Sequence, residues 1–348
     1  MRIVVLAGGL SSERDVSLVS GSLIANALME KGHKVLLVDV YEGLEIGDTG
    51  FEGLFYDINN GKTYKHNIST VEPNLNDIKQ NSQNGNMLIG KNVLEVCQYA
   101  DVVFMALHGG IGENGKLQGT FDILGIRYTG TGHVGSLLAM DKDLTKRLLI
   151  QSNIPTAPWI VVNASVTNKD LQNIELPCVI KPCNNGSSIG VYMAYSHSEI
   201  TTALENVKKY GDLIIIEKMI KGREFSVGVI EDKPLPVIEI IPNQGFYDYT
   251  NKYQNSHTTE ICPANLSSEQ TNKVQQLALK VHQTLRLGDY SRIDFILDEN
   301  DEFICLEANT LPGMTPTSLL PQEALASGIN YPELCEQIAM LPFKKCKK

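Results

Sequence analysis

Tyr290-Ser-Arg-Ile-Asp-Phe-Ile-Leu297, followed after a turn by Phe303-Ile-Cys-Leu-Glu-Ala-Asn309, is the stretch that decides the fold. Both runs are rich in the aromatic and β-branched residues that favour strands. The polar segment Asp298-Glu-Asn-Asp-Glu302 between them is typical of a turn. The pattern predicts a β-hairpin.

The polar residues of this hairpin predict a metal site. Residues two apart on a strand face the same way, so Arg292 shares a face with Asp294, and Glu307 shares one with Asn309. If the strands pair, three oxygen ligands converge beside one guanidinium. Mg²⁺ takes oxygen ligands and is usually held by one or two carboxylates plus substrate phosphates. The hairpin therefore predicts a site for Mg²⁺ that carries phosphate.

The bulk composition limits the class of protein. The chain has 348 residues, enough for two or three domains, with 43% hydrophobic and 20% charged residues. A net charge of −10 argues against a nucleic-acid partner, which requires a basic face. Seven scattered cysteines without a C-x-x-C pair indicate thiols in a reducing cytoplasm. The apolar start is cut short by Glu13 and Arg14, so we expect neither a signal peptide nor a membrane span.

The first part of the chain predicts a doubly wound α/β unit. The expected order is a buried strand over residues 2–7, a helix over 15–28, and strands over 34–40 and 101–107. Residues 41–92 are irregular and rich in Gly, Asn and Asp, and we expect an insertion without chemistry.

The later part predicts a change of architecture. A helix is expected from Met140 to Leu149, and Pro155 and Pro158 then open a new region. We expect further strands over residues 178–181, 213–217 and 225–230. A capped helix is expected to follow Ser267, with a Ser/Glu capping box.

Two segments could hold a nucleotide. Lys181-Pro-Cys-Asn-Asn-Gly-Ser-Ser-Ile-Gly190 follows a strand and offers backbone N–H groups and hydroxyls to phosphate oxygens, although alone it fits a hairpin turn with a surface lysine equally well. Glu217-Lys218-Met219 ends an apolar strand, where backbone groups and an acid suit adenine and ribose. Met219 could cover a purine face or simply belong to the core.

Two glycine-rich strand ends and one aromatic segment complete the candidates. His108-Gly-Gly ends a strand, where ligands of open α/β sheets bind, and His108 is either a turn residue or a functional group. Gly8-Gly9 is a weak dinucleotide signal because the G-x-G-x-x-G fingerprint is absent. Residues 246–253 form either a surface loop or a lid that excludes water.

Taken together and in order, these motifs resemble the D-alanine–D-alanine ligases of the ATP-grasp superfamily. The resemblance runs nearly end to end and is weakest in residues 41–92. The matching segments are residues 8–17, 108–119, 140–142, 181–190, 217–218, 246–253, 292–294 and 307–319. The family implies an α/β and α+β fold with three domains: a doubly wound parallel sheet over residues 1–139, and two α+β domains over residues 140–223 and 224–348 that grip ATP. It also implies a cytoplasmic enzyme and, as an expectation only, a homodimer.

The resemblance implies roles for individual residues. Contacts to ATP are implied for Lys142 and Lys181 (phosphates), Glu217, Lys218 and Glu224 (adenine and ribose), and Lys252 (transferring phosphate or second-substrate carboxylate). Two Mg²⁺ or Mn²⁺ ions are implied at Asp294, Glu307 and Asn309. D-Alanine contacts are implied for Glu13, His108, Ser318 and Leu319. A triad that closes the lid is implied for Glu13, Ser187 and Tyr253, and an oxyanion site for Arg292 and the Gly313 N–H.

The chain departs from the family pattern at four positions. Asn185 stands where a Glu is common, Met219 where Trp is frequent, Thr317 where His is frequent and Asn114 where Asp is frequent. Asn185 puts a carboxylate contact near the lid in doubt. None of the four is a predicted metal ligand or part of the oxyanion site.

Four other functions are compatible with parts of the sequence. A ligase that uses D-serine as second substrate stays open, because one added hydroxyl changes affinity only modestly in most pockets. D-Lactate is less favoured because Tyr253 is retained, whereas depsipeptide-forming members commonly lack this tyrosine. A non-catalytic nucleotide-binding module is disfavoured by the four polar residues of the hairpin, and a nicotinamide oxidoreductase by the missing fingerprint.

Overall fold

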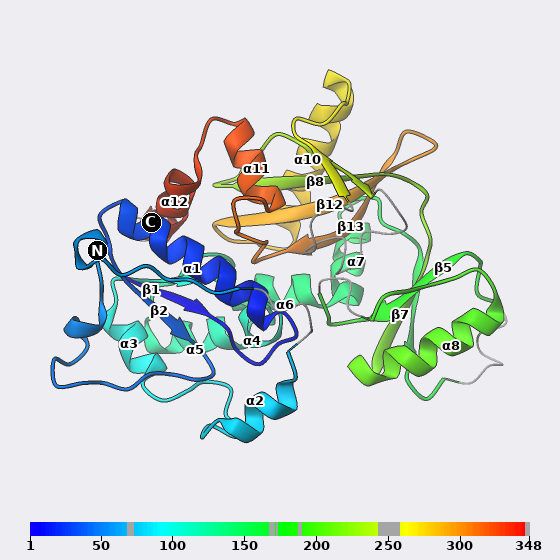
Figure 1. Cartoon of the computed structure of the whole chain (residues 1–348). Helices are drawn as coiled ribbons and strands as arrows, with labels where there is room; N and C mark the ends of the chain where they lie inside the picture. The colour runs from blue at the N-terminus through cyan, green and yellow to red at the C-terminus, as the bar shows by residue number, and fades with distance from the viewer. Residues whose placement is uncertain (68–72, 167–170, 172, 187–189, 243–257, 345–348) are drawn as a thin grey trace.

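The computed structural model describes residues 1–348 except 68–72, 167–170, 172, 187–189, 243–257 and 345–348. The described residues form three sheets, one parallel and two antiparallel, with helices packed on them (Figure 1). The predicted combination of a doubly wound parallel sheet with two α+β units is confirmed.

The first sheet is parallel and has the order β2-β1-β3. Its strands are β1 (Arg2–Ala7), β2 (Lys34–Asp39) and β3 (Val102–Met105). Ile3 to Leu6 are fully buried, as the continuous apolar run of a strand covered on both faces requires. Helices α1 (Arg14–Glu30) and α12 (Tyr331–Lys344) pack together on this sheet, so both ends of the chain share one core.

The remaining helices of this region lie on either side of β3 in the chain, between β2 and Met140. They are α2 (Leu75–Asn81), α3 (Val93–Tyr99), α4 (Gly110–Glu113), α5 (Lys116–Leu124) and α6 (His133–Met140), with 3₁₀ turns η1 (Glu52–Leu54) and η2 (Ile58–Asn60). Residues 41–92 were predicted to be irregular, but they contain the helix α2 and the two 3₁₀ turns. No described residue between 41 and 92 lines either of the two large cavities.

The second sheet is antiparallel with the order β4-β7-β5-β6. Its strands are β4 (Trp159–Asn163), β5 (Cys178–Pro182), β6 (Tyr192–Ala194) and β7 (Leu213–Lys218). Helix α8 (His197–Val207) packs on β5 and β6 and is followed by η3 (Lys208–Tyr210). The Ser196 hydroxyl caps α8 by accepting from the Glu199 N–H.

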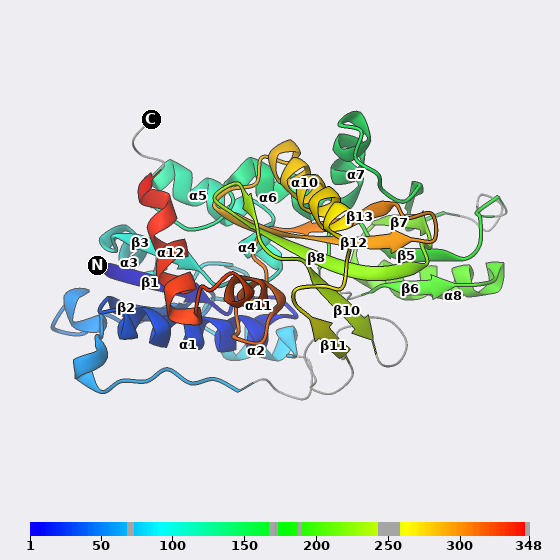
Figure 2. The ribbon, with the colours of Figure 1, turned by 90° about the horizontal axis from the view of Figure 1, so that it is seen from above.

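The third sheet is antiparallel with the order β11-β10-β8-β12-β13, and β9 pairs with β8. Its strands are β8 (Gly222–Ile230), β9 (Lys233–Pro234), β10 (Ile238–Pro242), β11 (Thr258–Ile261), β12 (Tyr290–Asp298) and β13 (Phe303–Asn309). Figure 2 shows α10 (Ser268–Thr284) and α11 (Leu319–Ala326) on opposite sides of this sheet. Val227 and Val229 pack in the core on the α10 side, whereas Gly228 between them meets α11.

The predicted hairpin and its register are confirmed. Arg292 lies opposite Asn309, and Asp294 lies opposite Glu307, so all four side chains share the Gly228 face of the sheet. A bulge follows, because Phe295 pairs with Cys305 rather than with Leu306.

Two helix predictions need correction. The helix expected from Met140 is interrupted: α6 ends at Met140, and α7 (Lys142–Gln151) starts anew because the Asp141 carboxylate accepts from the N–H groups of Asp143 and Leu144. In α10 the capping-box partner of Ser267 is Gln270 rather than a glutamate, since only residue N3 can reach back. The predicted domain boundaries stay predictions.

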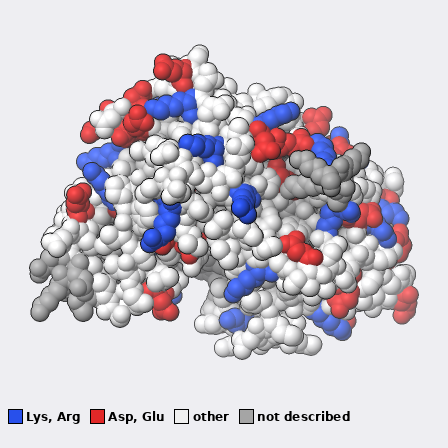
Figure 3. Space-filling model, turned by 180° about the vertical axis from the view of Figure 1, so that it is seen from behind, with Lys and Arg blue, Asp and Glu red and all other residues white. Residues whose placement is uncertain are grey.

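The surface and the helix lengths complete the description. On the face shown in Figure 3, acidic and basic side chains are interspersed. Across the described residues, each helix is too short or too polar to cross a lipid bilayer.

Candidate active site

Two large cavities meet inside the molecule. We name the first the substrate cavity and the second the nucleotide cavity, after the ligands that the sequence predicts for them. The substrate cavity has a volume of about 450 Å³ and lies between α1, the end of β13 and residues 310–319. The nucleotide cavity, of about 580 Å³, lies between the second and third sheets. Four residues line both, and they mark the junction: Lys142, Asn185, Gly186 and Glu307.

Glu13 lies in the wall of the substrate cavity and is 6% exposed. Its backbone N–H donates to the Ser11 hydroxyl (3.1 Å), which in turn donates to the His108 carbonyl (2.7 Å). The carboxylate packs against two glycines: a Cβ at Gly109 or Gly186 would meet Glu13 Oε2 at 3.0 or 3.7 Å. The strand-end glycines thus let a buried acid approach the cavity.

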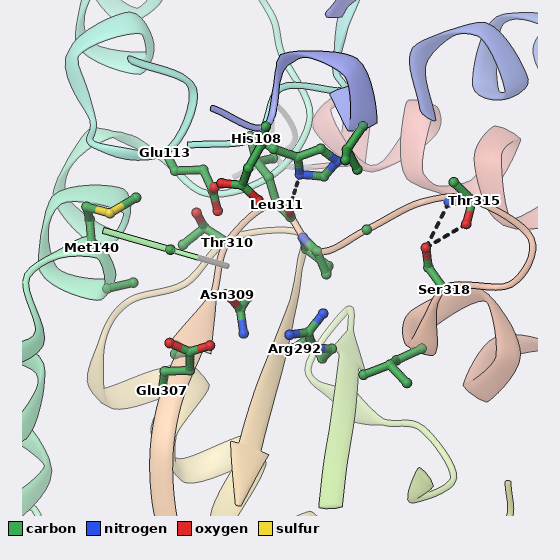
Figure 4. Close-up of a pocket in the computed structure, with 18 of the residues that line it drawn as sticks. His108, Glu113, Met140, Arg292, Glu307, Asn309, Thr310, Leu311, Thr315 and Ser318 are labelled. Atoms are coloured by element: carbon green, nitrogen blue, oxygen red, sulfur yellow. Dashed lines mark hydrogen bonds between the residues drawn. The ribbon is translucent and has the colours of Figure 1, made fainter. Parts of the chain in front are cut away.

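His108 is oriented by the loop that follows β13. Its Nδ1 lies 3.1 Å from the Leu311 carbonyl oxygen, as the dashed line in Figure 4 marks. Its Nε2 is buried and has no hydrogen-bond partner among the described residues. Burial lowers the pKa of His108 although Glu13 opposes the shift, so a neutral imidazole with one unused nitrogen faces this region.

Glu113 is a cavity residue for which the sequence suggested no role. It lines the substrate cavity from the short helix α4, and its Oε2 accepts from the Gly109 N–H at 2.6 Å. Burial, reinforced by the nearby Glu13 charge, raises the pKa of Glu113 to about 8. Its position inside the family-like segment of residues 108–119 was the available signal.

Asp294 collects donors from three directions. Arg292 binds it with two parallel hydrogen bonds, Nε to Oδ1 (3.0 Å) and an Nη to Oδ2 (2.8 Å). The Ser226 hydroxyl donates to Oδ1 (2.8 Å) and the Asn309 amide to Oδ2 (3.0 Å). Arg292 and Asn309 project from the paired strands into the same space in Figure 4.

The predicted metal ligands are therefore adjacent. Within the described residues no three His, Cys, Asp or Glu side chains cluster in a metal-binding group, so the predicted set depends on Asn309 as its third member. The side-chain nitrogen of Asn309 donates to Asp294, so the side-chain oxygen of Asn309 is the atom that remains to bind a cation. Two carboxylates and one amide oxygen fit a hard divalent cation.

The far wall of the substrate cavity is a helix start. Ser318 is the N-cap of α11, and its hydroxyl makes no capping bond to that helix. Instead it is tied to Thr315, at 3.1 Å from the backbone nitrogen and 2.8 Å from Oγ1 (Figure 4). Gly313, Ser318 and Leu319 all line the cavity, so it is bordered by the start of α11, where the first backbone N–H groups of a helix have no partner within the helix.

Lysines line the nucleotide cavity. Lys142 and Lys181 are 8% and 7% exposed, and Lys142 Nζ donates to the Asn185 carbonyl and lies 3.9 Å from Glu307 Oε2. Burial lowers the pKa of Lys142, with Glu307 opposing. The β5 strand and the start of α7 thus bring both predicted phosphate contacts to one place.

Glu217 lies at this cavity but its carboxylate is engaged by cations. Oε1 pairs with Lys181, and Oε2 lies 2.8 Å from Lys146 Nζ. Lys146 was missed by the sequence reasoning, although its spacing of four from Lys142 places both on one helix face. Lys218, Met219 and Glu224 also line the cavity. The contacts of Lys218 and Glu224 with adenine and ribose stay predictions.

Three predicted site residues, Ser187, Lys252 and Tyr253, lie outside the described residues, as do residues 246–253 of the predicted lid. The triad and the lid therefore stay predictions.

The turn after β1 is filled by the side chain of Asp39. Asp39 accepts from the N–H groups of Gly9 and Tyr41 and pairs with Arg14 at 2.5 Å. A Cβ at Gly8 would clash with the same carboxylate. An acid in the position of a phosphate argues further against a dinucleotide-binding turn.

Two antiparallel sheets that enclose a lysine-lined cavity, beside a parallel sheet, form the ATP-grasp architecture. Comparison with known proteins agrees. Models of the D-Ala–D-Ala ligase N-terminus and C-terminus match residues 2–131 and 148–340. The D-alanine–D-alanine ligase of Pediococcus pentosaceus is 41% identical over 343 residues, covering 98% of this chain and 97% of its own length. That of Lacticaseibacillus casei is 39% identical over 340 residues, covering 97% and 94%.

Solved structures match over the whole chain. A D-alanine–D-alanine ligase from Bacillus anthracis complexed with ATP superposes with a TM-score of 0.75 at 28% identity, covering 100% of this chain and 99% of that one. The chain belongs to the D-alanine–D-alanine ligase family.

Proposed function

We propose that this protein joins two D-alanine molecules into D-alanyl-D-alanine, a peptidoglycan precursor, at the expense of ATP. The observation that carries the proposal is the meeting of the two cavities at Lys142 and Glu307. A phosphoryl group bound in one cavity can reach a carboxylate bound in the other without passing through solvent. The related ligase from Bacillus anthracis was solved with ATP.

The nucleotide cavity supplies the activating reagent. A carboxylate is a poor acyl donor, and conversion to an acyl phosphate makes it reactive. Lys142 and Lys181 would contact the phosphates, and Lys218, Glu224 and the backbone around Glu217 would hold adenine and ribose. Asp294, Glu307 and Asn309 would hold two Mg²⁺ or Mn²⁺ ions, which neutralise phosphate charge when bound.

The substrate cavity positions the two amino acids. Glu13 would bind the ammonium of the first D-alanine beside His108. Ser318 and the Leu319 N–H, at the start of α11, would receive the carboxylate of the second. Arg292 and the Gly313 N–H would stabilise the tetrahedral oxyanion formed when the second amine attacks. Ser187, Lys252 and Tyr253 would complete the closed site and keep water from the acyl phosphate.

Cellular location and assembly belong to the same proposal. A cytoplasmic location fits the scattered cysteines, and a homodimer is an expectation from the family alone. Seven cysteines in the sequence, with all six thiols of the described residues free, agree with that compartment.

The test is ADP and phosphate release with D-alanine, D-serine and D-lactate each offered as second substrate beside D-alanine. Turnover that requires D-alanine in both positions supports the proposal. Preferential turnover with D-serine would identify a D-alanine–D-serine ligase. ATP binding without hydrolysis under all conditions would identify a non-catalytic nucleotide-binding module.

A further inference from the structure

Lys146 is a buried cation behind the nucleotide cavity. It lies one helical turn after Lys142 on α7, is 1% exposed, and is not among the residues that line either cavity. Its Nζ donates to Thr156 Oγ1 (2.9 Å) and to the Ala157 carbonyl (3.1 Å), and it forms an ion pair with Glu217 Oε2 (2.8 Å). Burial lowers the pKa of Lys146, and the charge of Glu217 opposes that shift. Two hydrogen bonds and one ion pair thus hold this ammonium group behind the cavity.

Glu217 lies between Lys146 and Lys181, the second of which lines the nucleotide cavity. It is 5% exposed and pairs through one oxygen with Lys146 and through the other with Lys181. Burial would raise the pKa of Glu217, but the charges of Lys181 and Lys146 outweigh it and lower that pKa. Burial likewise opposes the charge on Lys181, but Glu217 outweighs it and raises the pKa of Lys181.

The charge balance of the three side chains matters for a polyanionic ligand. Two buried lysines and one carboxylate carry a net charge of about +1. Without Lys146 the pair Glu217–Lys181 would be neutral, and the full carboxylate charge would hold Lys181 away from phosphate oxygens. Coulombic interactions in a buried site are strong, so the change would be felt across the short distance to the phosphates.

We propose that Lys146 is a positioning residue that shares Glu217 and so leaves Lys181 a cation available to the nucleotide phosphates. The inference rests on the proposed ATP site. It predicts that affinity for MgATP follows the net charge of the three side chains, rather than the presence of Lys146 itself.

The experiment measures the dissociation constants of MgATP and adenosine by calorimetry on the full-length protein. The variants are K146M, E217Q and the double variant K146M/E217Q, with K91M as the control, since Lys91 belongs to an exposed pair with Glu45. K146M should weaken MgATP binding by about tenfold or more, because it removes one buried positive charge near the phosphate site. Adenosine binding should stay within about twofold, because adenosine carries no phosphate. The double variant, with net charge restored, should recover most of the lost affinity, and K91M should match the wild type.

Three outcomes overturn the inference while leaving the function intact. The first is an unchanged MgATP affinity in K146M. The second is an equal loss in K146M and the double variant, and the third is a loss that extends to adenosine, because these two indicate a purely structural lysine. If K146M does not fold, E217Q and the double variant carry the comparison: E217Q should bind MgATP at least as tightly as the double variant, and weaker binding would contradict the charge argument. Failure of the wild type to bind MgATP overturns the proposed function together with this inference.

Discussion

Arg292 and Asp294 bridge the two cavities. They lie two residues apart on β12 and are joined by two hydrogen bonds of 3.0 and 2.8 Å. Arg292 lines the substrate cavity, whereas Asp294 lines the nucleotide cavity. A carboxylate that lines the nucleotide cavity therefore fixes the orientation of a guanidinium that lines the substrate cavity.

Replacing Arg292 by lysine should expose this dependence. Lysine keeps the positive charge but cannot form the two parallel bonds, so the donor would lose its fixed position. We expect turnover to fall about 100-fold, the size typical of a lost oxyanion donor, with a smaller change in the KM for ATP. Steady-state kinetics measure both. R147K, which alters an exposed pair with Asp143, serves as the control. Equal losses in both variants would show that Arg292 has no particular role.

Glu307 should be needed for turnover but not for folding. Its carboxylate lies at the junction of the cavities, opposite Asp294 and 3.9 Å from Lys142. E307Q keeps the shape but removes the charge that a divalent cation needs. We expect a loss of at least two decades, on the order of 3 kcal/mol in the barrier, with an unchanged melting temperature. E302Q, on the exposed turn beside Lys273, is the matched control. Full activity of E307Q would contradict the metal assignment.

Gly228 is required by the close approach of α11 to β8. A Cβ there would clash with Glu323 and Leu320, and the Gly228 N–H donates to Glu323 Oε2 at 2.6 Å. G228A should therefore destabilise the protein by about 1–3 kcal/mol, the cost of overpacking. Since α11 carries Leu319 at its start, the KM for the second D-alanine should also rise. G47A, where a Cβ meets nothing within 4 Å, should change neither thermal unfolding nor kinetics. A fully stable G228A would refute the close packing.

Glu323 should make stability depend on pH. It is fully buried, and burial raises its pKa well above the usual value, although the Gly228 N–H and Arg292 oppose the shift. Between the lower pKa of Glu323 in the unfolded state and its higher pKa in the folded state, the folded protein keeps a proton that the unfolded chain has released. The neutral acid contributes fully to the stability of the fold below the pKa that Glu323 has in the unfolded state. As the pH rises from there toward the pKa of Glu323 in the folded state, the free energy of unfolding falls by about 1.4 kcal/mol per pH unit.

E323Q removes this dependence because the amide does not titrate, while its oxygen can still accept from Gly228. The variant should be more stable than the wild type at pH 8, and the difference should shrink toward pH 5. Thermal unfolding across that range measures the effect. Parallel curves for the two proteins would show that Glu323 does not take up a proton on folding.

The fold could be predicted from the sequence where polar and apolar residues alternate along a strand. The alternation of Arg292, Asp294, Glu307 and Asn309 along two strands predicted their common face, and the structure confirms the register. The break between α6 and α7 was not predicted, because Asp141 caps a helix inside a run that also has continuous helical spacing.

The charge pairs of the site were harder to predict. Lys146, Lys181 and Glu217 come from a helix and two different strands, so their contacts depend on packing rather than local spacing. Glu323 similarly reads as an exposed helical acid in sequence, and only Gly228 in a distant strand makes room for it. Strand β4 and helix α8 were not predicted from the sequence and show the same limit.

The most direct measurement of the central claim follows both products in one reaction. The protein is incubated with MgATP and D-alanine, and ADP and D-alanyl-D-alanine are quantified together by mass spectrometry. We predict one dipeptide for each ADP, and negligible amounts of either when D-alanine is omitted. ADP formed without dipeptide, or nucleotide that is bound but never cleaved, would contradict the account.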